Sequence, residues 1–304
     1  MKKVKSFSPG KVIISGEHSV VYGQPALLAS INLGTTVTLS SGAKEPGNLL
    51  GKVRDLDLYT NHICQVVERQ LNIKLPGDWY FKVKSNLPVK AGLGSSAAYA
   101  HAVIQAVSQM LEADLSPNEL FELVWSAEDF VHGRSSGADP AAVVYGGLIS
   151  FQVIDGQPRT APVKTAGQVF QLVLIDSGSA VESTKQMVKI VAKQNKPEII
   201  KELGKITQQL IDELSFGQLN PKLINQSQQL LVKLGVVGYR AQSIINQVKK
   251  AGGKAKITGA GGAQAGSGWL LCWHPNPALL EELAAQNQTQ SLLITIPEES
   301  QNES

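Results

Sequence analysis

The stretch with the clearest chemical potential is a glycine loop, Gly-Leu-Gly-Ser-Ser, that begins at Gly92. Gly92 and Gly94 let the backbone adopt a positive φ at low cost, and Ser95 and Ser96 are residues that commonly cap a helix. The residues that follow, up to Met110, are small or apolar with helical spacing. The first N–H groups of a helix lack partners and the helix dipole is positive there, so such a loop can bind phosphate. A glycine turn that caps an ordinary core helix would have the same pattern.

Three polar residues near the N-terminus stand among apolar neighbours. Lys11 precedes an apolar stretch that reads as a buried strand, and Glu17 and His18 interrupt the apolar pattern after Gly16. A lysine or glutamate that is buried needs a partner or a function. The alternative is a surface hairpin whose charges are solvated.

Two acidic residues follow the glycine loop. Ser116 begins a capping box for a helix expected to run to about Val131. Glu128 lies at the edge of the apolar stripe of that helix, so its carboxylate either reaches solvent or points into a site. Asp139 lies in a run of glycines and serines. That run also contains G-x-S-x-G at residues 133–137, a serine hydrolase pattern, but a nucleophile elbow follows a strand and this run follows a helix.

A second glycine loop spans residues 259–268, between two predicted strands. Five of its ten residues are glycine, which is more than a hairpin with a bulge needs. The loop lacks the spacing of the familiar nucleotide-binding signatures. If this loop contacts a nucleotide, its geometry differs from that of those signatures.

The elements expected around these residues are strands between 4 and 40, a loop at 41–54 and alternating helices and strands beyond. We predict strands at 12–14, 20–22, 26–31, 35–39, 80–84, 170–175, 255–258, 269–273 and 292–296, and helices at 56–71, 95–110, 117–131, 183–193, 197–214, 221–234, 240–251 and 277–286. The change of character near residue 165 predicts two domains, 1–165 and 166–304.

Composition narrows the class of protein. The chain has 304 residues, of which 43% are hydrophobic and 17% charged, as in an ordinary globular enzyme. A net charge of +3 without a basic stripe argues against nucleic acid or a membrane surface as partner. Cys64 and Cys272 lack metal-site spacing and fit a reducing compartment. No apolar run suggests a signal peptide or a membrane span, so we expect a cytoplasmic protein.

The motifs together resemble the galactokinase, homoserine, mevalonate and phosphomevalonate kinase superfamily. They are Ser8-Pro9-Gly10-Lys11 with Gly16-Glu17-His18, then the loop that begins at Gly92, then Gly259–Gly262, in that order. Within the superfamily, residues 9–26 and the run from Glu128 to Asp139 resemble the mevalonate kinases. Galactokinases usually have Arg at the Lys11 position, and phosphomevalonate kinases usually have Tyr at the His18 position.

The resemblance implies an α+β fold of two domains, with an active site in the cleft between them. The N-terminal domain would be like domain 2 of ribosomal protein S5, and the C-terminal domain would be ferredoxin-like. The activity implied is transfer of a phosphoryl group from ATP to the C5 hydroxyl of mevalonate, with ATP as co-substrate, in isoprenoid precursor synthesis. Family members are commonly dimers, so a homodimer is expected.

The resemblance also implies roles for single residues. Asp139 would be the catalytic base, with Lys11 paired to it, and Ser96 and Glu128 would hold Mg²⁺. Glu17, His18, Ser136 and Thr184 would bind mevalonate. The ATP-binding residues would be Lys90, Ala91, Gly92, Leu93, Gly94, Ser95, Ser96, Gly259, Ala260, Gly261 and Gly262.

Three departures from the family pattern bear on the acceptor. Ser135 stands where the family usually has Pro, and Glu182 stands where it commonly has Arg. The late loop continues with Ala263-Gln264-Ala265, where further glycines are usual. Another small-molecule kinase of the superfamily, or a non-catalytic ligand sensor on the same fold, are therefore the alternatives.

Overall fold

The structure is a computed structural model that describes residues 2–42, 57–88, 92–133 and 135–297. The chain divides into two compact units that are discontinuous in sequence. The first contains Met1–Gly10, Leu33–Pro88 and Gly94–Tyr145, and the second contains Lys11–Asn32, Val89–Leu93 and Gly146–Ser304. Strands β1 (Lys3–Ser15) and β2 (Ala26–Ser41) contribute residues to both units. The domain boundary expected near residue 165 stays a prediction.

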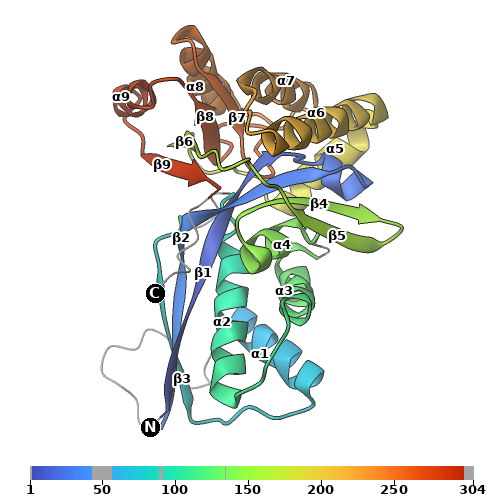
Figure 1. The fold of residues 1–304 in the computed structure, drawn as a ribbon, viewed down its shortest axis with the longest axis vertical. Coiled ribbons are helices and arrows are strands. Elements are labelled where there is room, and N and C mark those ends of the chain that lie inside the picture. Colours follow the sequence, from blue (N-terminus) through green and yellow to red (C-terminus); the bar gives the residue numbers. More distant parts are fainter. Residues whose placement is uncertain (1, 43–56, 89–91, 134, 298–304) are drawn as a thin grey trace. The chain divides into compact units, whose positions relative to one another are not determined.

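The described part of the first unit contains parts of the strands β1 and β2, all of β3 (Trp79–Ser85), and four helices that pack on one another (Figure 1). Strand β3 pairs antiparallel with the second half of β2, from Thr35 opposite Ser85 to Ser41 opposite Trp79. Helix α2 (Ser95–Leu111) contacts α1 (Leu58–Leu71), α3 (Pro117–His132) and α4 (Ala138–Tyr145). Alanine and valine fill most of the buried positions of α2, and such small side chains let neighbouring helices approach closely.

The helix starts of the first unit confirm one expected cap and correct another. Ser116 and Glu119 form the predicted capping box of α3. Helix α2 is capped by Gly94, whose backbone is left-handed with φ 71°, and no side chain bonds the cap position. The expectation that Ser95 or Ser96 caps this helix is therefore wrong. Glycine makes the sharp entry turn without a side chain, and the serines fall inside the first turn.

The second unit begins with the end of β1 and also contains the first half of β2. That half pairs antiparallel with β4 (Leu148–Ile154), with Ala26 opposite Phe151, and β4 forms a hairpin with β5 (Gln157–Pro162). In the sheet order β1, β2, β4 and β5 are successive neighbours, and β3 also pairs with β2. Ser19–Tyr22 is a 3₁₀ turn and not the expected strand, because Gly23 (φ 74°) ends the turn and reverses the chain.

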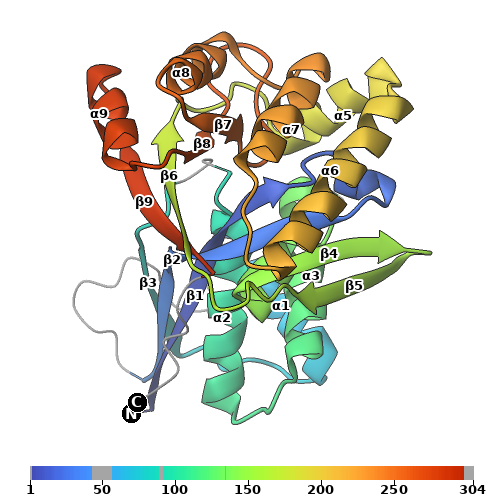
Figure 2. The same ribbon diagram turned by 45° about the horizontal axis from the view of Figure 1, so that its top comes forward.

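The remainder of the second unit is a four-stranded antiparallel sheet with helices (Figure 2). Its strands are β6 (Phe170–Asp176), β7 (Lys254–Ile257), β8 (Trp269–Trp273) and β9 (Ser291–Ile296), in the order β7-β8-β6-β9. Its helices are α5 (Thr184–Gln194), α6 (Pro197–Ser215), α7 (Pro221–Lys233), α8 (Tyr239–Lys250) and α9 (Ala278–Gln286). The chain order of strands and helices, with α5–α8 between the first two strands, confirms the ferredoxin-like expectation.

Among the residues that the structure describes, no helix is both long and apolar enough to cross a bilayer.

Candidate active site

Glu128 is the centre of a polar cluster in the first unit. Its side chain is buried, with none of its surface exposed. Ser96 donates a hydrogen bond from Oγ to Glu128 Oε2 at 3.0 Å, and Tyr59 donates from its phenol to Oε1 at 2.7 Å. Glu128 thus points into the protein, and the alternative that it reaches solvent is wrong.

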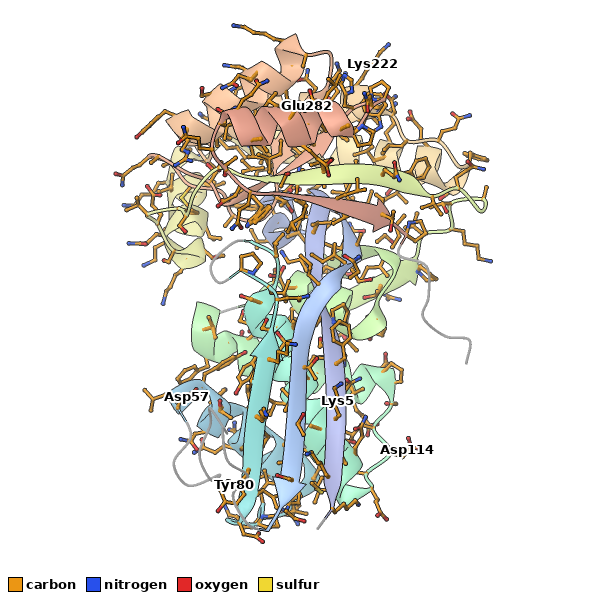
Figure 3. The ribbon with its side chains drawn as sticks, turned by 90° about the vertical axis from the view of Figure 1, so that its left-hand side faces the viewer. Lys5, Asp57, Tyr80, Asp114, Lys222 and Glu282 are labelled. Carbon is orange, nitrogen blue, oxygen red and sulfur yellow. The ribbon has the colours of Figure 1, made fainter. Side chains whose placement is uncertain are left out.

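Tyr59 is placed by the start of α1, and sequence reasoning missed it. Asp57, labelled in Figure 3, caps this helix: its Oδ1 accepts from the backbone N–H groups of Tyr59 and Thr60. The Tyr59 ring stacks on Phe130, with centroids 6.0 Å apart. Burial, and then the charge of Glu128, raise the pKa of Tyr59 well above its usual value, so the phenol keeps its proton and stays a donor. No local pattern marks this tyrosine, because its partner lies 69 residues away.

Ser96 and Glu128 together form a donor set that fits Mg²⁺. Both offer hard oxygen atoms, and Mg²⁺ in phosphate-transfer sites commonly takes one or two protein ligands, with water and phosphate oxygens for the rest. Among the described residues no group of three or more His, Cys, Asp and Glu side chains could hold a metal by itself. If Ser96 and Glu128 hold the ion, water and phosphate oxygens would complete its ligands.

Asp139 is the second residue of α4 and is half-buried. The turn before it is held by two serine hydroxyls: Ser135 Oγ accepts from Gly137 N at 3.2 Å, and Ser136 Oγ accepts from Ala138 N at 3.3 Å. Helix α3, and not a strand, leads into this turn, so the serine hydrolase interpretation of the G-x-S-x-G match has no support.

Lys11 and the two glycine loops meet in the second unit. Lys11 is 1% exposed, and its Nζ donates to the Gly92 carbonyl at 3.0 Å while its backbone N–H donates to Leu93 O. A Cβ added to Gly92 would lie 2.6 Å from Thr258 O, and one added to Gly259 would lie 3.1 Å from Gly92 Cα. Only glycine allows the two loops to approach this closely.

His18 joins the first motif to the third. Its side chain is 6% exposed, and its Nε2 lies 3.0 Å from the carbonyl oxygen of Ala260. Burial lowers the pKa of His18 to about 4, so the ring is neutral near pH 7. Because a carbonyl only accepts, Nε2 carries the hydrogen of that neutral ring. The burial of Lys11 and His18 shows that the solvated-hairpin interpretation is wrong.

Glu17 is paired with Lys256, a second residue that sequence reasoning missed. Both side chains are essentially fully buried, and Lys256 Nζ donates to Glu17 Oε1 and, at 2.7 Å, to the Ile257 carbonyl. Burial raises the pKa of Glu17 and lowers that of Lys256, while their mutual attraction opposes both shifts. The sequence feature that could have identified Lys256 is its position between the apolar residues Ala255 and Ile257 of a predicted strand.

Two of the departures from the family pattern contact each other. Glu182 Oε2 accepts from the backbone N–H of Ala263 at 3.3 Å, and Oε1 accepts from Gln264 Nε2 at 3.1 Å. The carboxylate therefore anchors the altered part of the late glycine loop. Thr184, nearby in sequence, is an exposed first residue of α5 after its Ser183 cap.

The predicted site residues thus fall into two groups. The first unit contains Gly94, Ser95, Ser96, Glu128, Ser136 and Asp139, and the second contains Lys11, Glu17, His18, Gly92, Leu93, Thr184, Gly259, Ala260, Gly261 and Gly262. Each group has direct internal contacts, Ser96 with Glu128 in the first and Lys11 with Gly92 in the second. Lys90 and Ala91 lie outside the described residues, and the pairing of Lys11 with Asp139 stays a prediction.

Comparison with known proteins identifies the family of this chain. Residues 59–147 match the family described as GHMP kinases N terminal domain. The chain is 33% identical over 299 residues to the mevalonate kinase of Thermococcus onnurineus, an alignment that covers 86% of this chain and 87% of that protein. The protein is thus a member of the GHMP kinases. Within them it belongs to the mevalonate kinase family.

Solved structures show the same fold. The mevalonate kinase of L. major in complex with R-mevalonate matches with a TM-score of 0.79 at 24% identity, over 96% of this chain and 95% of that one. The galactokinase of Lactococcus lactis complexed with galactose matches almost as well, with a TM-score of 0.77 at 18% identity, over 97% and 94%. The fold by itself therefore does not select the acceptor.

Proposed function

We propose that the protein is an ATP-dependent mevalonate kinase that makes 5-phosphomevalonate and ADP for isoprenoid precursor synthesis. The observation that carries this proposal is the set of contacts that joins three motifs: Lys11 to Gly92, Gly92 to Gly259, and His18 to Ala260. The 33% identity to a mevalonate kinase over most of the chain supports mevalonate as the acceptor.

ATP would be bound mainly by backbone groups. Gly92, Leu93, Gly94, Ser95 and Ser96 lead into α2, whose unpaired N–H groups suit phosphate oxygens. Gly259–Gly262 lies against Gly92 and would contact the same phosphates. Lys90 and Ala91 belong to this proposal through the family resemblance.

In the reaction, the C5 hydroxyl oxygen of mevalonate attacks the γ-phosphorus as the bond to the leaving ADP breaks. Asp139 would accept the proton that this hydroxyl loses. Lys11, paired with Asp139, would offset the negative charge that develops in the transition state. Little covalent work is left to the protein, since phosphoryl transfer depends mostly on positioning and charge.

Mevalonate would be oriented by polar groups. We assign His18, Ser136 and Thr184 to this role. The neutral His18 ring is held by Ala260, and the Ser136 hydroxyl keeps its own hydrogen free to donate after it accepts from Ala138 N. Glu17 is bonded to Lys256, and its part is developed below.

Mg²⁺ would be held by Ser96 and Glu128. When bound, it neutralises charge on the phosphate oxygens. Tyr59 donates a hydrogen bond to Oε1 of the Glu128 carboxylate. This bond fixes the direction in which Oε2, the oxygen bonded to Ser96, points.

Tyr59→Phe is expected to weaken metal binding about tenfold, because residues that orient a metal ligand commonly contribute that much affinity. Mn²⁺ binding followed by electron paramagnetic resonance measures this without turnover, and the Mg²⁺ concentration for half-maximal activity should rise in parallel. Tyr99→Phe is the matched control, since the Tyr99 hydroxyl contacts Thr60 and not Glu128. Unchanged Mn²⁺ affinity in Tyr59→Phe would show that Tyr59 does not orient the ligand.

A coupled ATPase assay with Mg·ATP tests the function across mevalonate, phosphomevalonate, galactose and homoserine. We expect the highest kcat/KM on mevalonate. A higher kcat/KM on another alcohol would show that this alcohol is the acceptor. Glu182 and the altered loop would then be related to that difference. Ligand binding without any turnover would instead identify a sensor.

Two further properties belong to the same proposal. Cys64 and Cys272 are both free and buried, which fits an enzyme of the reducing cytoplasm. The homodimer implied by the family resemblance is measurable by light scattering of the purified protein.

A further inference from the structure

Lys256 has no role in the catalytic steps described above. Its side chain has none of its surface exposed, and Glu17 beside it is 1% exposed. Removing two charges from water is expensive, and a buried ion pair repays that cost only with good geometry and additional hydrogen bonds. The Lys256–Glu17 pair adjoins the segment that contains Lys11 and His18, so its energetic cost needs a functional explanation.

The contacts of Lys256 tie the first motif to the third. Its Nζ donates to Glu17 Oε1, to Ile257 O at 2.7 Å and to Ile13 O at 3.4 Å. Contacts on either side of it join the same two segments. Ile13 N donates to Thr258 Oγ1 at 2.8 Å, and His18 Nε2 contacts Ala260 O. The segment that carries Lys11 is thus held against the strand that leads into the glycine loop.

The charge of Lys256 also affects how Glu17 interacts with Lys11. Lys11 and Lys256 both attract the Glu17 carboxylate, and the attraction of Lys256 is the larger. Without Lys256, the buried Glu17 charge would have Lys11 as its nearby cation. Glu17 Oε2 has no hydrogen-bond partner among the described residues, so the carboxylate has little else to satisfy it.

We propose that Lys256 is a positioning residue that pairs with Glu17 and fixes the Lys11–His18 segment against the Thr258–Gly262 loop. The proposal rests on the proposed function and deepens it. Glu17 then acts through Lys256, as part of the support of the site, and not by binding mevalonate.

The test is a double-mutant cycle of Lys256→Met, Glu17→Gln and their combination, assayed for kcat and for both KM values well below the unfolding midpoint of each variant. Lys256→Met should lower kcat about 100-fold, a typical cost of a small misplacement, with KM for mevalonate changed less than about threefold. The double variant should regain about tenfold in kcat over Lys256→Met, because it leaves no uncompensated buried charge. Lys254→Met is the control: Lys254 lies two residues earlier in β7, and its Nζ donates to the Gly252 and Gly253 carbonyls.

Multiplicative losses in the cycle, or a Lys256→Met variant as active as Lys254→Met, would overturn the proposal. So would a Glu17→Gln variant with normal kcat and a raised KM for mevalonate, since that marks a direct ligand. If Lys256→Met does not fold, a folded and active double variant supports the coupling. If neither folds, Glu17→Gln alone decides by whether kcat or KM changes. Wild-type turnover on mevalonate tests the proposed function separately from this coupling.

Discussion

Asp139→Asn is expected to lower kcat about a thousandfold, within the range that a positioned general base contributes. Asparagine has the size of aspartate and suits the first turn of α4, but it cannot accept the proton of the attacking hydroxyl. Binding of ATP and of mevalonate should persist, because both depend on other groups. Steady-state kinetics give kcat, and isothermal titration calorimetry gives the two affinities.

Asp114→Asn is the control for this prediction. Asp114 is exposed and lies beyond the end of α2, as Figure 3 shows. Its variant should keep wild-type kinetics. A wild-type kcat in Asp139→Asn would exclude Asp139 as the base, and loss of ATP binding would indicate that the residue supports the nucleotide site instead.

Lys11→Met is expected to lower kcat by about 100- to 1000-fold, the scale observed when a charge-stabilising donor is removed from an active site. Methionine fills much of the buried volume of lysine but carries no charge and cannot donate to Gly92 O. KM for ATP and mevalonate should rise far less than kcat falls, since the charge acts mostly in the transition state. Lys5→Met, on the exposed part of the same strand, is the control (Figure 3).

The double variant Asp139→Asn with Lys11→Met tests whether the two residues act as a pair, although they belong to different compact units. Groups that act as one unit have strongly non-additive losses. The double variant should therefore be only slightly slower than the slower single variant. Losses that multiply would show that Lys11 serves the phosphate charge independently of Asp139.

The sequence by itself determined the features that depend on neighbouring residues. The Ser116 capping box starts α3 as predicted, and the helical and strand patterns after residue 165 give the ferredoxin-like order of the second unit. Periodicity and caps act within one or two turns of chain, so they can be recognised without a fold. Family resemblance supplied what such rules cannot, including the expectation that Ser96 and Glu128 hold Mg²⁺.

The tertiary structure alone decided the features whose partners lie far apart in sequence. Tyr59 reaches Glu128 across 69 residues, and Lys256 reaches Glu17 across 239. Lys256 stands between two apolar residues of a predicted strand, a local pattern that does not identify its partner, and the packing of β7 against the first motif removes it from water. Burial and charge pairing arise from the whole fold, which is why the support of the site appeared only in three dimensions.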